Sequence, residues 1–226
     1  MADPRIVHNP RIIKQVTYHE LRELSYMGAT VLHEESIFPV RKAGIPIQVK
    51  NTNHPEDPGT LIVPDAGLGS AGPITGIAGR KGFTVISVEK ANMNAELGFG
   101  RRILSALEKN DIRFEHMPSG IDTLSVVLAN SEINGKEAKL MDDVYNLCQP
   151  DSLEVFKGLA LIATVGRGMI RNVGVAARLF TALAKANVNI RMIDQGSSEM
   201  NIIVGVEEKD FEPAIKAIYG AFCDQA

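Results

Sequence analysis

Three carboxylates lie in the segment DIRFEHMPSGIDTLSVVL, residues 111–128: those of Asp111, Glu115 and Asp122. The pattern predicts two short strands around a Ser-Gly turn, with an apolar second strand. Acidic side chains on such a pair either face solvent or offer acceptors to a small cation or an ammonium group. A second copy of the segment in the same chain allows these two interpretations to be compared.

Residues 83–128 align without a gap on residues 159–204, which predicts an internal duplication. Met93, for example, aligns with Met169, an offset of 76 residues because 169 − 93 = 76. Each copy has the pattern of a strand, a helix, two strands around a turn and a second helix. The first copy continues into one more strand, SLEVFKG. This order predicts an α+β fold of two ferredoxin-like βαββαβ units.

The second copy has no fourth strand of its own after its second helix. The strand-like piece ITGIAG, residues 74–79, stands before the first copy without a partner. A sheet that lacks an edge strand leaves backbone donors and acceptors unpaired. The sequence therefore predicts that residues 74–79 join residues 158–226 in the second unit, and that the first unit, residues 83–157, is inserted within it.

The first 63 residues have a different pattern. Thr17 and Glu20 form a predicted capping box at the start of a helix that ends near Gly28. A second helix and two strands, IPIQVKN and TLIV, follow. The stretch PDAGLGSAGP, residues 64–73, has the composition of a linker, and without a lysine it does not resemble a phosphate-binding loop. These elements are typical of the end of a larger α/β domain.

Composition excludes several classes of function. The chain of 226 residues has 24 basic and 27 acidic residues, so its net charge of −3 argues against nucleic acid or anionic membrane as a partner. No segment is apolar over a membrane-spanning length. Cys148 and Cys223 are expected to be reduced and buried, and the five histidines lack the spacing of a metal site. A cytoplasmic globular protein is expected.

Several motifs resemble one family. ADPRIV, YMGATVLHEES, IPIQVKNT and GTLIV resemble the end of the catalytic domain of aspartate kinases, and the two predicted units resemble the tandem ACT domains of those enzymes. The resemblance covers essentially the whole chain. It implies a parent enzyme that uses ATP with magnesium to phosphorylate the side-chain carboxylate of L-aspartate, a step towards lysine, threonine and methionine. This chain would be its allosteric, amino-acid-sensing region.

The resemblance also places nucleotide contacts. Arg5 matches the family's nucleotide-contacting arginine, although an exposed salt-bridge arginine is the alternative interpretation. Thr30 stands where many relatives have a nucleotide-contacting lysine. The family's Lys-Phe-Gly-Gly-Thr-Ser segment is not among these 226 residues. Because phosphoryl transfer depends on several positioned loops, the chain alone is expected to bind no cofactor and to have no catalytic residue.

In the family, the effector amino acid binds between the first ACT domains of two subunits, which implies a homodimer or a higher homo-oligomer. It is held by the loop before the first helix and by the second strand with its turn. The effector residues implied here are Met93, Glu96, Leu97, Gly98, Phe99, Glu115, Ser119, Gly120 and Asp122.

The two copies differ at the acids of this site. Glu115 aligns with Arg191 and Asp122 with Ser198, so the fold does not require the acids. Two carboxylates favour a dibasic ligand, L-lysine, over threonine. The alternative functions are a stand-alone, non-catalytic regulatory subunit and, more weakly, an ACT-type sensor attached to another enzyme.

Overall fold

The computed structural model describes residues 1–29, 34–64 and 72–223. The chain forms two compact units, one of Met1–Arg80 with Ala160–Ala226 and the other of Lys81–Leu159. Two long strands, β4 (Gly76–Glu89) and β6 (Ser152–Val165), contribute residues to both units.

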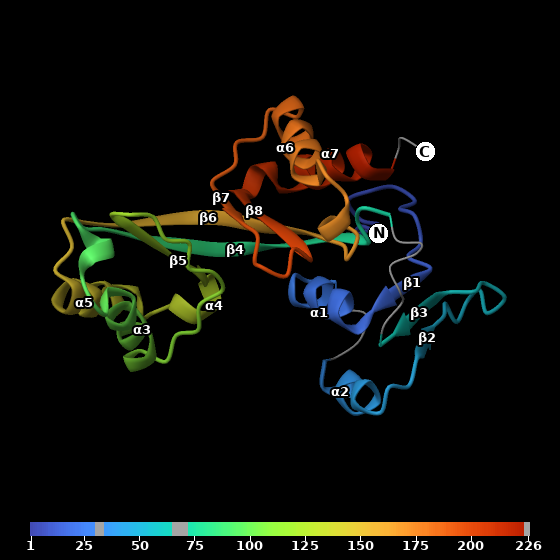
Figure 1. The fold of residues 1–226 in the computed structure, drawn as a ribbon, viewed down its shortest axis with the longest axis horizontal. Helices are drawn as coiled ribbons and strands as arrows, with labels where there is room; N and C mark the ends of the chain where they lie inside the picture. The colour runs from blue at the N-terminus through green and yellow to red at the C-terminus, as the bar shows by residue number, and fades with distance from the viewer. Residues whose placement is uncertain (30–33, 65–71, 224–226) are drawn as a thin grey trace. The chain divides into compact units, whose positions relative to one another are not determined.

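The unit of Lys81–Leu159 has the predicted plait (Figure 1). Its sheet has the strand order β5-β4-β6, in which β5 (Thr123–Ala129) pairs antiparallel with β4. The helices α3 (Phe99–Lys109) and α5 (Glu137–Cys148) cover one face of this sheet, and the short α4 (Asn130–Ile133) follows β5. Apolar residues at helical spacing on α3 and α5 meet the apolar face of the strands in one core.

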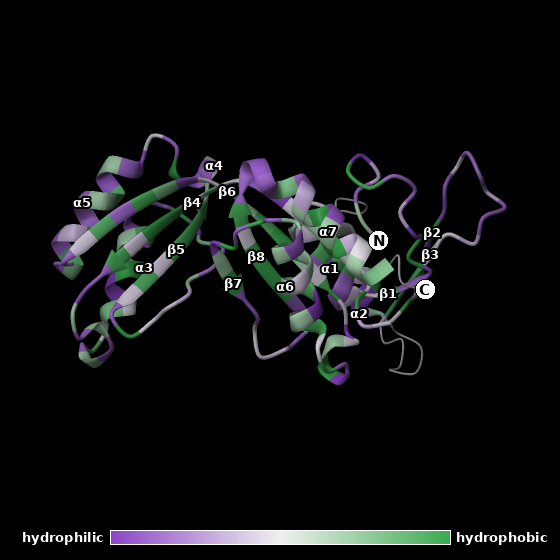
Figure 2. Ribbon diagram, turned by 90° about the horizontal axis from the view of Figure 1, so that it is seen from above, coloured by the Kyte–Doolittle hydropathy of each residue, from purple (hydrophilic) through white to green (hydrophobic). Residues whose placement is uncertain are grey.

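The other unit contains the second plait, with the strand order β4-β6-β8-β7. Its elements are η2 (Met169–Arg171), α6 (Val175–Lys185), β7 (Met192–Asp194), β8 (Asn201–Glu207), η3 (Glu208–Asp210) and α7 (Phe211–Cys223). The backbone amide of Thr75 donates to Val165 O at 2.7 Å. Residues 74–79 therefore lie beside β6, and the predicted insertion of one unit in the other is confirmed. Figure 2 shows β8 as almost wholly hydrophobic, as a central strand should be.

The sequence suggested separate strands before and after residue 80, but β4 runs through without a break, and β6 likewise. Gly82 and Gly158 lie within these strands at φ of 90° and 77°. The two glycines occupy equivalent positions of the duplication, since 158 − 82 = 76. Only glycine adopts such angles at little cost, so each strand changes its course there without ending.

The expected strand at residues 114–119 was wrong, since only the isolated bridges His116↔Val127 and Ser119↔Leu124 form there. Val127 accepts from the amide of Glu115 at 2.8 Å and donates to His116 O at 2.9 Å, so two residues oppose one, as in a β-bulge. Pro118 has no N–H group to donate. A bulge and a proline within six residues prevent a regular ladder.

The N-terminal segment forms a small sheet of order β1-β3-β2, with β1 (Gln15–Thr17) parallel and β2 (Ile47–Val49) antiparallel to β3 (Thr60–Val63). The helices α1 (Tyr18–Tyr26) and α2 (Glu34–Lys42) accompany it. The predicted capping box is confirmed, because Thr17 and Glu20 exchange hydrogen bonds at the start of α1. Most of the predicted linker, residues 65–71, lies outside the described residues.

Hydrogen bonds also correct the alignment of the two copies. The amide of Lys90 donates to Asp122 O, and the amide of Gly166 donates to Met200 O. The donors are 76 residues apart (166 − 90), whereas the acceptors are 78 apart (200 − 122). The second copy therefore has two extra residues in its turn, and Asp122 corresponds to Met200 rather than to Ser198. The second copy still has no acid at that position.

Candidate functional site

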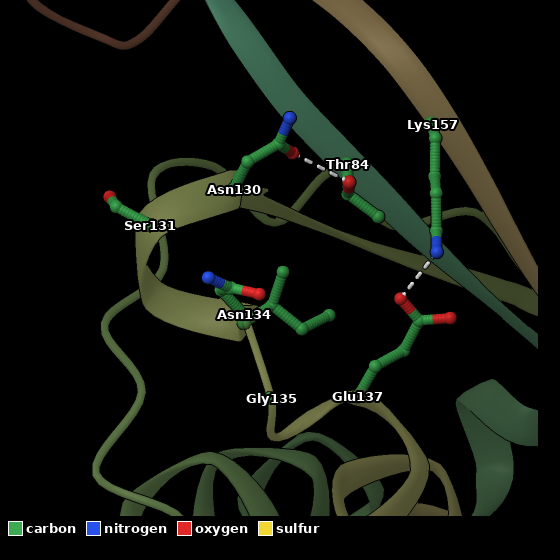
Figure 3. Close-up of a pocket in the computed structure, with 8 residues that line it drawn as sticks. Thr84, Asn130, Ser131, Asn134, Gly135, Glu137 and Lys157 are labelled. Atoms are coloured by element: carbon green, nitrogen blue, oxygen red, sulfur yellow. Dashed lines mark hydrogen bonds and ion pairs between the residues drawn. The ribbon is translucent and has the colours of Figure 1, made fainter.

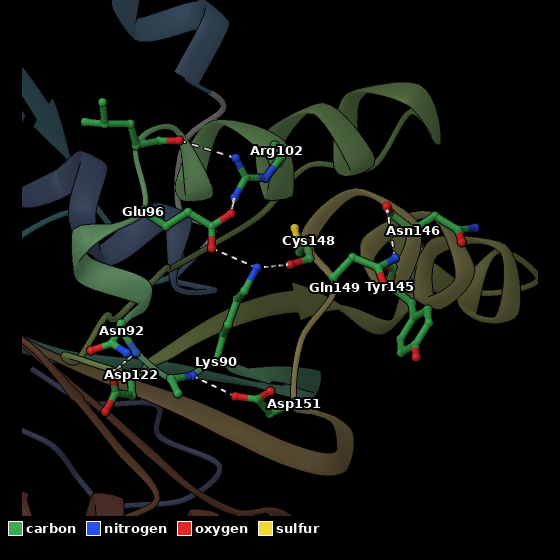
Figure 4. A network of polar contacts seen from close by, with 12 residues as sticks. Lys90, Asn92, Glu96, Arg102, Asp122, Tyr145, Asn146, Cys148, Gln149 and Asp151 are labelled. Atoms are coloured by element: carbon green, nitrogen blue, oxygen red, sulfur yellow. Dashed lines mark hydrogen bonds and ion pairs between the residues drawn. The ribbon is translucent and has the colours of Figure 1, made fainter.

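The predicted effector segments, 93–99 and 115–122, lie beside one another in the unit of Lys81–Leu159 (Figure 4). The amide of Asn94 donates to Ile121 O at 3.1 Å. The amide of Asn92 donates to the carboxylate of Asp122, Oδ1, at 2.8 Å. Three residues of the β4–α3 loop, including Lys90, are thus tied to the two residues before β5.

The loop between β4 and α3 ends in an uncapped helix start. Asn92 has a left-handed backbone conformation, the short helix η1 (Met93–Ala95) follows, and Gly98 is the N-cap of α3 with φ of 75°. Glycine provides no side-chain acceptor for the N–H groups of the first turn. Gly98 is also exposed. This helix start is therefore able to accept a carboxylate.

The carboxylate of Glu96 is held by two cations. Lys90 Nζ lies 2.7 Å from Glu96 Oε2, and the guanidinium of Arg102 bonds Oε1. Hydrogen bonding from Lys90, with the charge of Arg102, holds the pKa of Glu96 below its usual value against the effect of desolvation. Lys90 Nζ also donates to the backbone oxygen of Cys148 at 2.8 Å. Glu96 therefore fixes the loop, and it is not a free acceptor for a ligand ammonium group.

Two of the predicted effector residues have their side chains in the core. Met93 is 5% exposed and Phe99 4%, and both pack with the apolar residues of α3 and β4. The cationic groups of Lys90 and Arg102 lie 5.7 and 5.5 Å from the centre of the Phe99 ring. Met93 and Phe99 support the loop from beneath, which corrects their prediction as side-chain contacts. Leu97 is 95% exposed and projects from the loop.

The two acids of the predicted site have different environments. Asp122 is exposed, and Glu115 is half-buried at the bulge beside β5. Ser119 and Gly120 form the exposed turn between them, closed by the amide of Gly120 on Thr123 O at 2.7 Å. The turn accepts no larger residue at position 120 without a shift, because a Cβ there would come 2.7 Å from Thr123 Oγ1.

A further carboxylate holds the same loop, and the sequence did not reveal it. Asp151 Oδ2 accepts from the amide of Ala91 at 2.7 Å, and the amide of Asp151 donates to Glu89 O at 2.8 Å (Figure 4). The amides of residues 91 and 92 are therefore both bound by carboxylates of the chain itself. Lys90, Arg102 and Asp151 were missed because each acts across a long sequence separation.

A cavity of about 390 Å³ lies elsewhere in the same unit (Figure 3). Thr84 Oγ1 donates to Asn130 Oδ1 at 2.7 Å, and Lys157 pairs with Glu137 at 2.7 Å. None of the predicted effector residues lines this cavity. Its lining residues are Thr84, Asn130, Ser131, Ile133, Asn134, Gly135, Glu137 and Lys157. The effector residues instead form an exposed surface of the chain.

Of the predicted nucleotide contacts, Arg5 has a side chain that is 88% exposed and bonds the carboxylate of Asp3 at 2.7 Å. This pair lowers the pKa of Asp3, chiefly through the hydrogen bond from Arg5. Exposure leaves Arg5 accessible to a phosphate, which would have to compete with Asp3. Thr30 lies outside the described residues.

Comparison with known proteins agrees with this architecture. Residues 162–222 match the ACT domain family, and residues 1–51 match the amino acid kinase family. Aspartokinase 3 of Bacillus subtilis is 42% identical over 222 residues, which are 98% of this chain and 49% of that protein. The chain belongs to the aspartokinase family. It spans about half the length of the curated relative it matches.

Solved aspartokinase structures have the same fold. The aspartate kinase of Clostridium acetobutylicum is 58% identical with a TM-score of 0.92, over 98% of this chain and 52% of that one. Escherichia coli aspartokinase III, solved with lysine and aspartate in its T-state, is 25% identical with a TM-score of 0.80, over 98% and 49%. In the described part of the aspartokinase chain, no helix is long and apolar enough to cross a membrane.

Proposed function

We propose that this chain is the effector-sensing regulatory region of an aspartate kinase. The whole protein then transfers the terminal phosphoryl group of ATP, with magnesium, to the side-chain carboxylate of L-aspartate. In this proposal residues 83–157 are the first ACT domain, residues 74–79 with 158–226 the second, and residues 1–63 the end of the kinase domain. The match of residues 1–51 to the amino acid kinase family favours this function over a stand-alone regulatory subunit.

The observation that carries the sensing role is the attachment of the β4–α3 loop to residues 121 and 122. This attachment places the uncapped start of α3 and the acids Glu115 and Asp122 on one unit. A ligand α-carboxylate is expected at the N–H groups after Gly98, where the helix dipole also favours negative charge. A ligand ammonium group is expected at Glu115 and Asp122.

L-lysine is the proposed effector. It carries two ammonium groups, and the two acids supply charge-assisted acceptors that threonine uses less fully. The lysine complex of Escherichia coli aspartokinase III supports this choice. Because the effector residues form an exposed surface, a second copy of the chain is proposed to enclose the ligand. Lysine bound between two copies would stabilise one relative arrangement, which is how a ligand shifts an enzyme between active and inhibited states.

Two measurements test this function. Titration calorimetry of the 226-residue chain with L-lysine is expected to show saturable binding, with weaker binding of L-threonine. A coupled ADP-release assay of the same chain with ATP, magnesium and aspartate is expected to stay at the blank rate, because the family's Lys-Phe-Gly-Gly-Thr-Ser segment is not in it. No heat with either amino acid would overturn the sensing role, and aspartate-dependent turnover would overturn the inactivity of the chain alone.

A further inference from the structure

The duplication gives each residue at the start of the fourth strand an equivalent in the other copy. The amide of Asp151 donates to Glu89 O at 2.8 Å, and the amide of Thr75 donates to Val165 O at 2.7 Å. Both pairs are related by the same offset, since 151 − 75 and 165 − 89 are each 76. Thr75 therefore occupies the position in the second ACT unit that Asp151 occupies in the first.

This exchange of aspartate for threonine removes a carboxylate from the second unit. In the first unit, Asp151 Oδ2 binds the amide of Ala91 at 2.7 Å. The equivalent of Ala91 is Arg167, because 167 − 91 = 76. A threonine hydroxyl at position 75 does not provide the charged acceptor that the first unit has at this place.

A carboxylate from the kinase-family segment takes the vacant role. The amide of Arg167 donates to Glu20 Oε1, on α1, at 3.0 Å, although the two residues are 147 apart in sequence. Thr75 Oγ1 donates to the same oxygen at 2.5 Å. The backbone amide at the equivalent loop position thus binds a carboxylate in both units, from within the unit in one case and from α1 in the other.

Burial and charge show that Glu20 is more than a local helix cap. Its side chain is fully buried, and that of Arg167 is 11% exposed. Glu20 Oε2 accepts from Thr17 N at 2.9 Å, from Thr17 Oγ1 at 2.8 Å and from Arg167 Nη1 at 2.8 Å. A buried carboxylate needs such donors, because an unpaired charge away from water is very costly.

The surrounding backbone is fitted to the same contact. A Cβ at Gly166 would come 2.5 Å from Ile74 Cα, so the loop of residues 166–168 packs directly on the chain before β4. A second side-chain bond joins the same two elements, from Asn201 Nδ2 on β8 to Glu23 Oε2 on α1 at 2.6 Å.

We propose that Glu20 is the residue through which the kinase-family segment docks on the second ACT unit, in place of the carboxylate that Asp151 provides in the first. The β6–η2 loop, which corresponds to the effector loop of the first unit, is occupied by α1 of the same chain and takes no effector. A displacement of this loop is passed to α1 through Arg167. This regulatory consequence rests on the proposed function, whereas the docking itself does not.

Hydrogen exchange of the 226-residue chain, read by mass spectrometry without any ligand, tests the docking. Glu20→Gln keeps the shape and removes the charge, and it is expected to accelerate exchange of the α1 amides by at least about ten-fold, as the loss of hydrogen bonds to a charged group implies. Glu23→Gln, also on α1, is the matched control and is expected to change this exchange by less than about three-fold. Asp151→Asn is expected to expose the loop at residues 90–92 and to leave α1 unchanged.

Thr75→Asp separates docking from a merely structural role, and it remains informative if the Glu20 variant fails to fold. The new carboxylate is expected to bind the amide of Arg167 as Asp151 binds that of Ala91, and to repel Glu20. Exchange at α1 then accelerates while residues 166–168 stay protected. Equal loosening of α1 and this loop, or α1 exchange within about two-fold of the native chain in Glu20→Gln, would overturn the proposal. Either result leaves lysine binding to the first unit untouched.

Discussion

Asp122 accepts a hydrogen bond from the backbone amide of Asn92 at 2.8 Å, so an acid predicted to bind a ligand also holds the loop that carries the other half of the site. The backbone oxygen of Asp122 is bound as well, by the amide of Lys90 at 2.9 Å. Charge at this position therefore has two effects that mutagenesis can separate, because asparagine keeps an acceptor at Oδ1 and alanine does not.

Replacing Asp122 by alanine is expected to destabilise the chain by about 1 kcal/mol, the typical contribution of one hydrogen bond. The value is at the lower end for a charged acceptor, because Asp122 is exposed and water can hydrate the amide of Asn92. Asp122→Asn is expected to cost less than half as much. Urea unfolding of the two variants measures the difference. Equal stabilities of the alanine and asparagine variants would show that the bond to Asn92 contributes nothing.

Lysine is expected to raise the thermal midpoint of the native chain, and threonine to raise it less. A ligand at one hundred times its dissociation constant adds about 2.7 kcal/mol to the state it binds, which shifts the midpoint of a protein of this size by several degrees. Glu115→Gln and Asp122→Asn are expected to reduce the lysine shift, because each removes one charge with little change of shape.

The matched control for this experiment is Arg191→Gln, at the position of the second copy that corresponds to Glu115. It should leave the lysine shift unchanged, because the second copy is not expected to bind the effector. If neither acid variant alters the shift, the carboxylates are a solvated surface and the site is wrong. If threonine shifts the midpoint more than lysine, the site stands with a different ligand.

Stability is expected to fall in acid because of Glu20. Burial alone would raise the pKa of Glu20, but hydrogen bonds from Thr75, Thr17 and Arg167 outweigh it, so the pKa lies below its ordinary value of 4.5. A lowered pKa in the folded state means that the contribution of Glu20 is complete above the ordinary value and is lost as the pH falls through the folded-state pKa.

Urea unfolding between about pH 6 and pH 3 measures this effect. Glu20→Gln is expected to be less stable at pH 6 by about 3 kcal/mol, since it leaves Arg167 buried without its partner, and to lose less stability on acidification. Glu23→Gln serves again as the control and should follow the native curve. A Glu20→Gln curve parallel to the native one across this range would contradict the assignment.

The chain is expected to form at least a dimer in solution. The effector residues lie on an exposed surface, whereas sites for small ligands usually bury most of the ligand, so a second copy is needed to enclose lysine. Sedimentation or light scattering at micromolar concentration, with and without lysine, measures the mass. The mass of a monomer, about 24.5 kDa, under both conditions would count against both the dimer and the shared site.

Local patterns in the sequence were sufficient for much of the fold. The duplication predicted two plaits because both copies repeat the same hydrophobic spacing, and the missing fourth strand predicted the place of residues 74–79. The capping box of Thr17 and Glu20 and the burial of Cys148 and Cys223 were also predicted, and all are present. Each of these features depends on residues near one another in sequence or on apolar character alone.

The tertiary structure alone established the partners of the charged residues. Glu20 had a complete local explanation as a helix cap, yet its carboxylate also binds Arg167, 147 residues away. Glu96 and Asp122 were predicted as ligand acceptors, but folding brings Lys90, Arg102 and the amide of Asn92 to them. Hydrophobic periodicity repeats along the chain and can be read locally, whereas a charge pairs with whichever donor the fold places within about 3 Å of it, and that distance exists only once the units have formed.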